Sequence, residues 1–467
     1  MELLYQDSYN KYIEPLYGKT RNNNQDTVLI ENNILPHTYS ISNKERTDFT
    51  HIPCYSVDPD GCEDADDAFS IYNENGELIL AIHIADPTEH INIDSLLWSN
   101  IIDRAVTKYP LGNPPIHLMP EFIVQKSSLM ENEYGKEKNA ITVYTEIDTQ
   151  TYLPKKKIKL CFSKIRVCKE NAMTYHKAAH SSLDILSNGL NISNALQEKR
   201  RGETLGVKLS ELNQSTIQFG NIYPELHTDH PIEKKMKQMI AEFAIFANTF
   251  VGEYLKLHMN GRGIFRTCIA KEWLNTVSTE ISGENLLNEI IINGIQADYI
   301  SSNLSHDLVG SPEYCHFTSP IRRMADCVCH YLLKYVFLLN KQPSLEPPFS
   351  NYELEGLSKK CLQVTKQVKK IQYQDIKFRL IQCMSGLLTT HKSICITYFV
   401  TSYTGLFLNI IICKINDFNV HLSYVLRIKN YKEDIHKEKY TIHITTINPP
   451  HKFDEGTIPE LDQFFKK

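Results

Sequence analysis

The stretch VDPDGCEDADDAF, residues 57–69, places six acidic side chains between Asp58 and Asp67. Because like charges repel, such crowding is costly unless cations bind among the carboxylates. The acidic residues lead directly into the apolar run AFSIY, and a second apolar run, LILAIHIAD, follows the turn-forming residues NENGE. This pattern predicts a β-hairpin whose first strand is preceded by a cation-binding acidic loop.

Hard divalent cations prefer carboxylate oxygens. The candidate ligands in this loop are Asp58, Asp64, Asp66 and Asp67. An EF-hand calcium site is excluded, because Gly61 is fourth rather than sixth from Asp58 and a strand follows instead of a helix. A solvated acidic turn would explain the charge, but not why Asp66 and Asp67 run straight into an apolar strand. The pattern favours Mg²⁺, with Mn²⁺ as an alternative, and two ions about 4 Å apart would suit phosphodiester hydrolysis.

The composition is that of an ordinary folded chain of 467 residues, for which two to four domains are expected. The formal net charge is −5, so an anionic partner must bind at local positive patches. No apolar run has the roughly 20 residues of a membrane span, and the first residues lack the pattern of a signal peptide. The twelve cysteines include no CxxC pair. We therefore expect an intracellular, reduced protein of the cytoplasm that has no membrane association.

The chain divides into regions of different character. Residues 1–50 are polar and weakly periodic, which predicts an extended arm. Helical spacing over 233–256 predicts a long helix with one apolar face. A further helix is expected over about 354–384. Its lysines, which are most simply read as a solvated face, are Lys359, Lys360, Lys366, Lys369, Lys370 and Lys377.

Four β-rich runs follow at short spacing after Gly386. They are KSICITYFV, GLFLNIIICKI, NVHLSYVLRI and KYTIHITTI. Their pattern predicts a small closed barrel of the OB type over 389–450, followed by a tail over 451–467. Exposed aromatic residues of the barrel could stack on bases, although core packing would explain them equally well.

The segment HFTSPIRRMAD predicts a helix with Ser319 as N-cap and Pro320 at the first helical position. In that register Arg322 and Arg323 lie in the first turn, where positive charge opposes the helix dipole. A phosphate bound at this helix start would resolve the conflict. The alternative is a structural salt bridge between these arginines and the acidic loop.

Together these stretches resemble a known family. SVDPDGCEDADDAFSI (56–71), AIHIADPTEHI (81–91) and YCHFTSPIRRMADCVCHYLL (314–333) are similar to signatures of the RNB domain in the ribonuclease II and R family, which includes the exosome catalytic subunit. The resemblance implies an α/β catalytic domain over 51–388, with mixed sheets and long helices around a narrow channel. The expected C-terminal region is an OB- or S1-like barrel. It also implies a Mg²⁺-dependent 3′→5′ exoribonuclease that hydrolyses single-stranded RNA, in preference to DNA, to 5′-mononucleotides.

The family's site residues can be carried over by position. The four aspartates are implied to bind Mg²⁺, with Asp66 and Arg322 catalytic and Arg322 and Arg323 at the scissile phosphate. TKYPLGNPPIHLMP resembles the segment whose tyrosine, here Tyr109, stacks on 3′-terminal bases. AMTYHKA resembles the segment of a second substrate-contacting tyrosine, Tyr175, and MIAEFAIFAN resembles the helix whose glutamate, Glu242, contacts ribose. Without the resemblance, these three would be read as packing or ordinary helix residues.

The chain also departs from the family pattern. About 50 residues precede the RNB-like region, too few for the cold-shock-type barrels usual there, and Met324 stands where an aromatic residue is commoner. The segment between GIFRT and YCHFTSP is shorter than usual. One rival hypothesis is a non-catalytic RNA-binding or scaffold protein on the same fold. Another is a metal-dependent phosphatase, which would not explain the barrel or the second signature.

Overall fold

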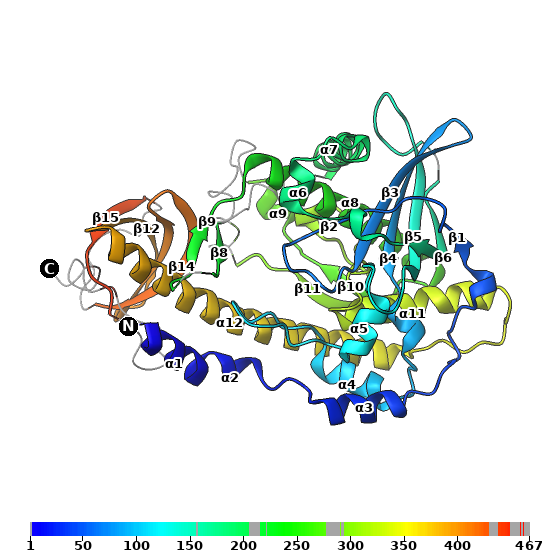
Figure 1. Ribbon diagram of the computed structural model, residues 1–467, viewed down its shortest axis with the longest axis horizontal. Coiled ribbons are helices and arrows are strands. Elements are labelled where there is room, and N and C mark those ends of the chain that lie inside the picture. Colours follow the sequence, from blue (N-terminus) through cyan, green and yellow to red (C-terminus); the bar gives the residue numbers. More distant parts are fainter. Residues whose placement is uncertain are drawn as a thin grey trace.

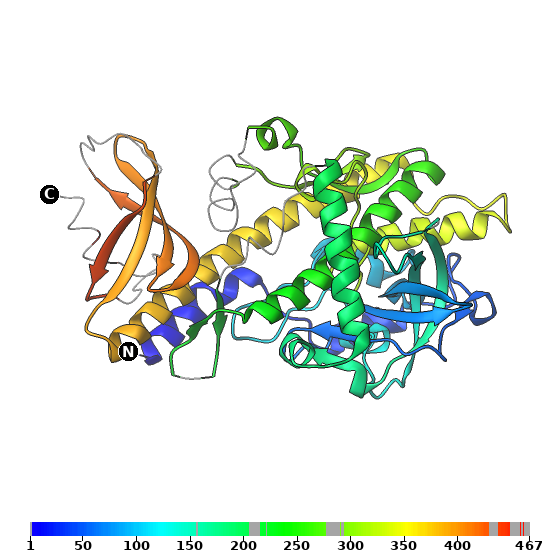
Figure 2. The ribbon, with the colours of Figure 1, turned by 90° about the horizontal axis from the view of Figure 1, so that it is seen from above.

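The computed structural model describes residues 2–155, 157–204, 215–220, 222–276, 290, 294–428, 438–448, 458 and 461. Two β-containing parts lie at opposite ends of the long helix α12 (Asn351–Thr390), as Figure 1 shows. Figure 2 shows the same arrangement from above, with the C-terminal sheet at one end of α12 and the larger sheet at the other. Within the described ranges, no helix is long and apolar enough to cross a membrane.

The larger sheet has five strands in the order β1-β6-β5-β4-β3, and only β1 and β6 pair in parallel. Its strands are β1 (Thr47–Asp48), β3 (Asp67–Glu74), β4 (Glu77–Ala85), β5 (Glu137–Ile147) and β6 (Lys159–Arg166). The predicted hairpin is confirmed as β3 and β4. Asn75 and Gly76 both have positive φ at its tip, as a tight two-residue hairpin turn requires.

Helices cover this sheet and bury its apolar side chains in the main core. They are α3 (Asn23–Glu31), α4 (Leu96–Arg104), α5 (Glu121–Ser127), α6 (Tyr175–Ala179), α7 (Asp184–Thr204), α8 (Pro231–His258), α9 (Lys271–Leu274) and α11 (Met324–Leu339). The helix predicted over 233–256 is confirmed as α8, and Phe243 on its apolar face meets Phe69 of β3 at a ring-centroid distance of 5.4 Å. Three small two-stranded sheets pair β2 (Ser56–Asp58) with β7 (Ala172–Thr174), β8 (Thr216–Gln218) with β9 (Glu225–His227), and β10 (Arg262–Thr267) with β11 (Asp298–Ser302).

The predicted start of the helix after HFTSP is wrong. α11 begins at Met324 with Arg323 as its N-cap, and Ser319 and Pro320 lie before it. The reason is tertiary: the Ser319 amide donates to Asp326 Oδ1 (2.8 Å), and the Ile321 amide donates to Asp66 Oδ1 (2.8 Å). These bonds hold the segment outside the helix, so the argument from the helix dipole does not apply to Arg322.

The N-terminal arm is helical rather than extended. It contains α1 (Glu2–Tyr12) and α2 (Glu14–Tyr17), which run beside α12 in Figure 1. Tyr5, Tyr9 and Tyr17 are fully buried in a second core with residues of α12 and the C-terminal sheet. The polar sequence shows little helical periodicity because these helices depend on tertiary packing around a few tyrosines.

The C-terminal region is a four-stranded antiparallel sheet in the order β14-β13-β12-β15. Its strands are β12 (Ile394–Tyr403), β13 (Phe407–Ile415), β14 (Phe418–Arg427) and β15 (Tyr440–Ile444). All four predicted strand runs are therefore present. Among the described residues β14 and β15 do not pair, so the sheet is open and the predicted closed barrel is not formed by them. The predicted tail 451–467 lies outside the described residues except for Ile458 and Leu461, which are buried in the second core.

Candidate active site

The acidic loop connects the end of β2 at Asp58 to the start of β3 at Asp67. Backbone hydrogen bonds fix its second half: Ala85 donates to the carbonyl of Asp66 (2.8 Å), and Leu129 donates to that of Ala65 (2.9 Å). The loop is thus held between the end of β4 and the segment after α5. This support orders the carboxylates before any cation binds.

Asp66 joins the two sequence signatures. Its side chain is only 3 % exposed, and it accepts hydrogen bonds from the Ile321 amide (2.8 Å) and from Arg322 Nε (2.9 Å). Arg322 also donates to Ser319 Oγ (2.9 Å), while 45 % of its side chain remains exposed. Burial raises the pKa of Asp66 to about 7, although the Arg322 charge and the Ile321 amide oppose the rise. The salt bridge considered from the sequence is therefore present, and it leaves part of the guanidinium open to solvent.

Asp58 and Asp67 form a second buried pair of carboxyl groups. Burial raises the pKa of Asp67 to about 7, and the charge of Asp58 raises it further. Burial also raises the pKa of Asp58 to about 6, helped by the charges of Asp66 and Asp64. Oδ2 of Asp58 is buried and has no hydrogen-bond partner among the described residues. A buried carboxylate oxygen without a partner is costly, and a divalent cation would supply the missing charge.

The aspartates are not drawn tightly together. Within the part of the chain that the structure describes, one group of three metal-binding side chains has all its ligand atoms within 4.8 Å of one another, and that group is His227, Asp229 and Glu233. The loop aspartates are spaced more widely, as mutual repulsion between carboxylates predicts. The donor set of the loop nevertheless fits a hard cation, because it consists of carboxylate oxygens in a partly buried loop.

Two of the predicted substrate-binding tyrosines flank this loop. The hydroxyl of Tyr109 donates to Asp64 Oδ2 (3.1 Å), and the residue is 38 % exposed. Tyr175 is the first residue of α6 and follows Thr174, the register partner of Asp58. Burial raises its pKa, and the charges of Asp67 and Asp58 raise it further. Both rings therefore lie beside the carboxylates, and that of Tyr109 remains accessible.

The other two predicted contacts lie in different surroundings. Glu242 of α8 is 2 % exposed and forms an ion pair with Arg200 Nη2 of α7 (2.6 Å). Arg323 Nη2 is paired with Asp326 Oδ1 (2.8 Å) and not with the acidic loop. Their proposed roles at the RNA stay predictions.

A buried charge cluster that sequence reasoning missed supports the loop from below. Asp86, directly after β4, is bound by Arg46 Nη2 (2.7 Å) and Lys334 Nζ (3.0 Å), and Lys334 also reaches Glu89 (2.8 Å). Although burial opposes it, these two cations hold the pKa of Asp86 well below its ordinary value. The available signal was the pair of acidic residues in AIHIADPTEHI, next to a buried strand. The cluster fixes the end of β4, whose Ala85 amide holds Asp66.

A second missed residue is Asp375 of α12, which is fully buried. Its Oδ2 accepts hydrogen bonds from Tyr17 (2.8 Å), Tyr9 (3.2 Å) and the Leu111 amide (2.8 Å). Asp375 therefore ties the segment that carries Tyr109 to α12 and to the N-terminal helices. No sequence signal distinguishes it from the other polar residues of that long helix.

Comparison with known proteins supports the resemblance. The RNB domain model matches residues 46–338. The human exosome complex exonuclease RRP44 is 28 % identical over 340 residues, which are 62 % of this chain and 34 % of that protein. Ribonuclease R of Thermotoga maritima is 24 % identical over 68 % of this chain and 48 % of that protein. The chain thus spans between a third and a half of the length of these relatives.

Solved structures show the same fold. RNase R of Mycoplasma genitalium, in complex with ribose-methylated single-stranded RNA, aligns with a TM-score of 0.73 and 17 % identity over 94 % of this chain and 76 % of that one. Yeast Ssd1, described as a pseudonuclease, aligns with a TM-score of 0.67 and 18 % identity over 91 % of this chain and 55 % of that one. Because the family model covers more than half of the sequence, the chain belongs to the RNB-domain family.

Proposed function

We propose that this chain is a Mg²⁺-dependent 3′→5′ exoribonuclease that hydrolyses single-stranded RNA to 5′-mononucleotides. The observation that carries the proposal is the contact between Asp66 and Arg322, which brings an acidic loop and a half-exposed guanidinium to one place. The named exonucleases among the relatives support the same class of reaction.

The residues that would hold the metal are Asp58, Asp64, Asp66 and Asp67. The unpartnered Oδ2 of Asp58 and the raised pKa values of the buried carboxyls fit sites that are completed by cations. When bound, Mg²⁺, as one ion or two, would activate a water and stabilise the leaving oxygen of the phosphodiester. Mn²⁺ has similar ligand preferences and would substitute for it.

The chain's own residues would position the RNA. Arg322 has donors beyond the Nε that binds Asp66, so its guanidinium can contact a phosphate oxygen and offset the charge that develops there. The exposed ring of Tyr109 would stack on the 3′-terminal base, since base–aromatic stacking suits single strands of any sequence. Tyr175 and Glu242 would contact the sugars, and a contact to the 2′-hydroxyl would favour RNA over DNA. Glu242 would have to share its carboxylate with Arg200 to do so.

We further propose that the C-terminal sheet belongs to an OB- or S1-like barrel over 389–450 that guides RNA toward the catalytic domain of residues 51–388. Its four antiparallel strands and its position at the end of α12 support this assignment. Residues 1–50 would then act as a brace, because α1 and α2 pack in the core that α12 shares with this sheet.

The second candidate is a non-catalytic RNA-binding protein on the RNB fold. It is favoured by the similarity to a pseudonuclease and by the wider spacing of the loop aspartates. The two candidates differ in one experiment: incubation of 5′-labelled single-stranded RNA with Mg²⁺, using the wild type and Asp66→Asn. We expect shortening of the RNA by the wild type and RNA binding without shortening by the variant, since contacts to phosphates dominate affinity. Binding without cleavage by both proteins would favour the second candidate.

A further inference from the structure

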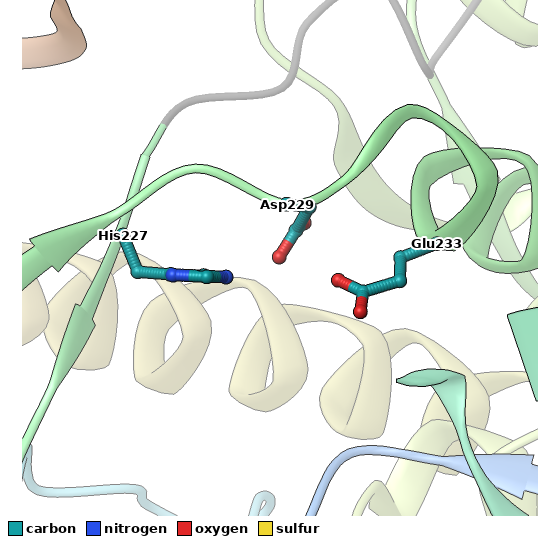
Figure 3. A group of neighbouring side chains, drawn as sticks. All are labelled: His227, Asp229 and Glu233. Carbon is teal, nitrogen blue, oxygen red and sulfur yellow. The ribbon is translucent and has the colours of Figure 1, made fainter. Parts of the chain in front are cut away.

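A second group of metal-binding side chains lies where the hairpin β8–β9 leads into α8. His227 is the last residue of β9, Asp229 lies in the link, and Glu233 is in the first turn of α8. One ligand atom from each lies within 4.8 Å of the others. Figure 3 shows the three side chains turned toward a common space from the hairpin and the helix start.

More histidines surround this group. His176 Nδ1 of α6 lies 2.7 Å from Glu233 Oε1, and its ring lies 4.4 Å from that of His180. The His180 ring lies 6.4 Å from that of His230, the N-cap of α8. Neutral imidazole is the commonest metal ligand in proteins, and a carboxylate–histidine contact is the usual support around a metal-binding side chain. The cluster therefore supplies both ligands and the groups that would orient them.

Ordinary structural roles account for only part of the group. Glu233 Oε2 caps the His230 amide (3.3 Å), and Asp229 Oδ2 binds Lys237 Nζ (2.6 Å). Each carboxylate keeps a second oxygen that could bind a cation. The ring of His227 makes no hydrogen bond with any described residue, although it points at both carboxylates. Helix capping and one salt bridge leave the orientation of this imidazole unexplained.

We propose that His227, Asp229 and Glu233 bind one divalent transition-metal ion of the zinc class. A mixed set of imidazole and carboxylate ligands suits Zn²⁺, whereas Mg²⁺ prefers oxygen ligands alone. Three protein ligands leave a fourth position, which water or His176 would take. This site shares no ligand with the acidic loop.

The ion would connect two parts of the molecule. The hairpin lies between them, because Ser215, just before β8, donates its amide to the Asn419 carbonyl of β14 (2.8 Å). A metal bound by both β9 and α8 would therefore fix the hairpin to the catalytic domain and, through it, restrain the C-terminal sheet. Its role is structural and separate from hydrolysis.

The test is equilibrium dialysis of the full chain against Zn²⁺ in millimolar Mg²⁺, with the bound zinc measured by elemental analysis. Mg²⁺ would occupy the oxygen ligands of the acidic loop, so the zinc retained would report the mixed site. We expect one Zn²⁺ per chain in the wild type, and the same stoichiometry in Asp66→Asn. The matched control is His391→Ala, which removes an exposed histidine at the end of α12 and should bind zinc like the wild type.

His227→Ala should weaken zinc binding by at least about tenfold. Asp229→Asn should do the same, and it provides a second test if the first variant is poorly folded. Zn²⁺ should also raise the melting temperature of the wild type and of His391→Ala, but not that of His227→Ala. An unchanged zinc affinity in both ligand variants, or no zinc binding by the wild type, would overturn the proposal.

Discussion

Replacing Asp66 with Asn should stabilise the metal-free protein at alkaline pH while it abolishes hydrolysis. Asp66 is almost fully buried, and its pKa is raised from the ordinary 3.8 to about 7. This difference corresponds to a cost on the order of 4 kcal/mol for holding the charge in the folded state above pH 7. Asn keeps an oxygen that can accept the Ile321 amide and carries no charge.

The sign follows from linkage. A carboxyl group with a raised pKa contributes stability that is fully present below the unfolded-state value and is lost as the pH rises through the folded-state value. The wild type in EDTA should therefore lose this contribution between about pH 4 and pH 7, and Asp66→Asn should not. The two proteins should be equally stable near pH 4. At about pH 8 the variant should be more stable by up to about 4 kcal/mol.

The assay is denaturant unfolding of both proteins in EDTA at several pH values, repeated with Mg²⁺. Mg²⁺ should narrow the difference, because an ion that binds only the folded wild type stabilises it. Asp60→Asn, which changes an exposed acid of the same loop, is the control and should alter stability by less than about 0.5 kcal/mol. A variant that is no more stable than the wild type at pH 8 in EDTA would refute the account of the buried carboxyls.

Four further predictions address the RNA path and its supports. Arg322→Lys should lower kcat by about 10²- to 10³-fold with little change in RNA affinity; full activity in single-turnover assays would remove its role at the phosphate. Glu242→Ala should narrow the ratio of RNA to DNA cleavage rates, and an unchanged ratio would leave Glu242 as the partner of Arg200 alone. A folded truncation that lacks 389–467 should bind long RNA more weakly and flatten the salt dependence by about 0.7 per lost phosphate contact, whereas an unchanged slope would make this region a structural cap. Asp375→Ala should cost roughly 3–5 kcal/mol of unfolding free energy, because it leaves the Leu111 amide and two tyrosine hydroxyls without their buried acceptor; a cost under 1 kcal/mol would contradict the bracing role.

Local patterns predicted much of the fold. The hairpin β3–β4 and the helix α8 depend on periodicity within one segment, and their observed limits differ from the predicted ones by only a few residues. Charge complementarity between the two signatures also anticipated the contact of Arg322 with Asp66. These features could be predicted because each is encoded by neighbouring residues or by a simple opposition of charge.

The remaining features depend on tertiary contacts. α11 starts late because the amides of Ser319 and Ile321 bind distant or later carboxylates rather than cap a helix. The N-terminal helices form against α12, and nothing in their own sequence requires burial of their tyrosines. Closure of the C-terminal sheet depends on strand partners that alternation of apolar residues does not specify. The pairing of Glu242 with Arg200 likewise joins two helices whose packing the sequence does not reveal.

The most direct test of the central claim is the identity and order of the products released from single-stranded RNA. The same RNA would be labelled at its 3′ end in one reaction and at its 5′ end in another, with the wild type and Mg²⁺. The account predicts that the 3′ label appears at once as a 5′-mononucleotide, while the 5′ label shortens stepwise, and that EDTA or Asp66→Asn stops both. Internal fragments, release of the 5′ label first, or intact RNA bound to a folded wild type in Mg²⁺ or Mn²⁺ would contradict it.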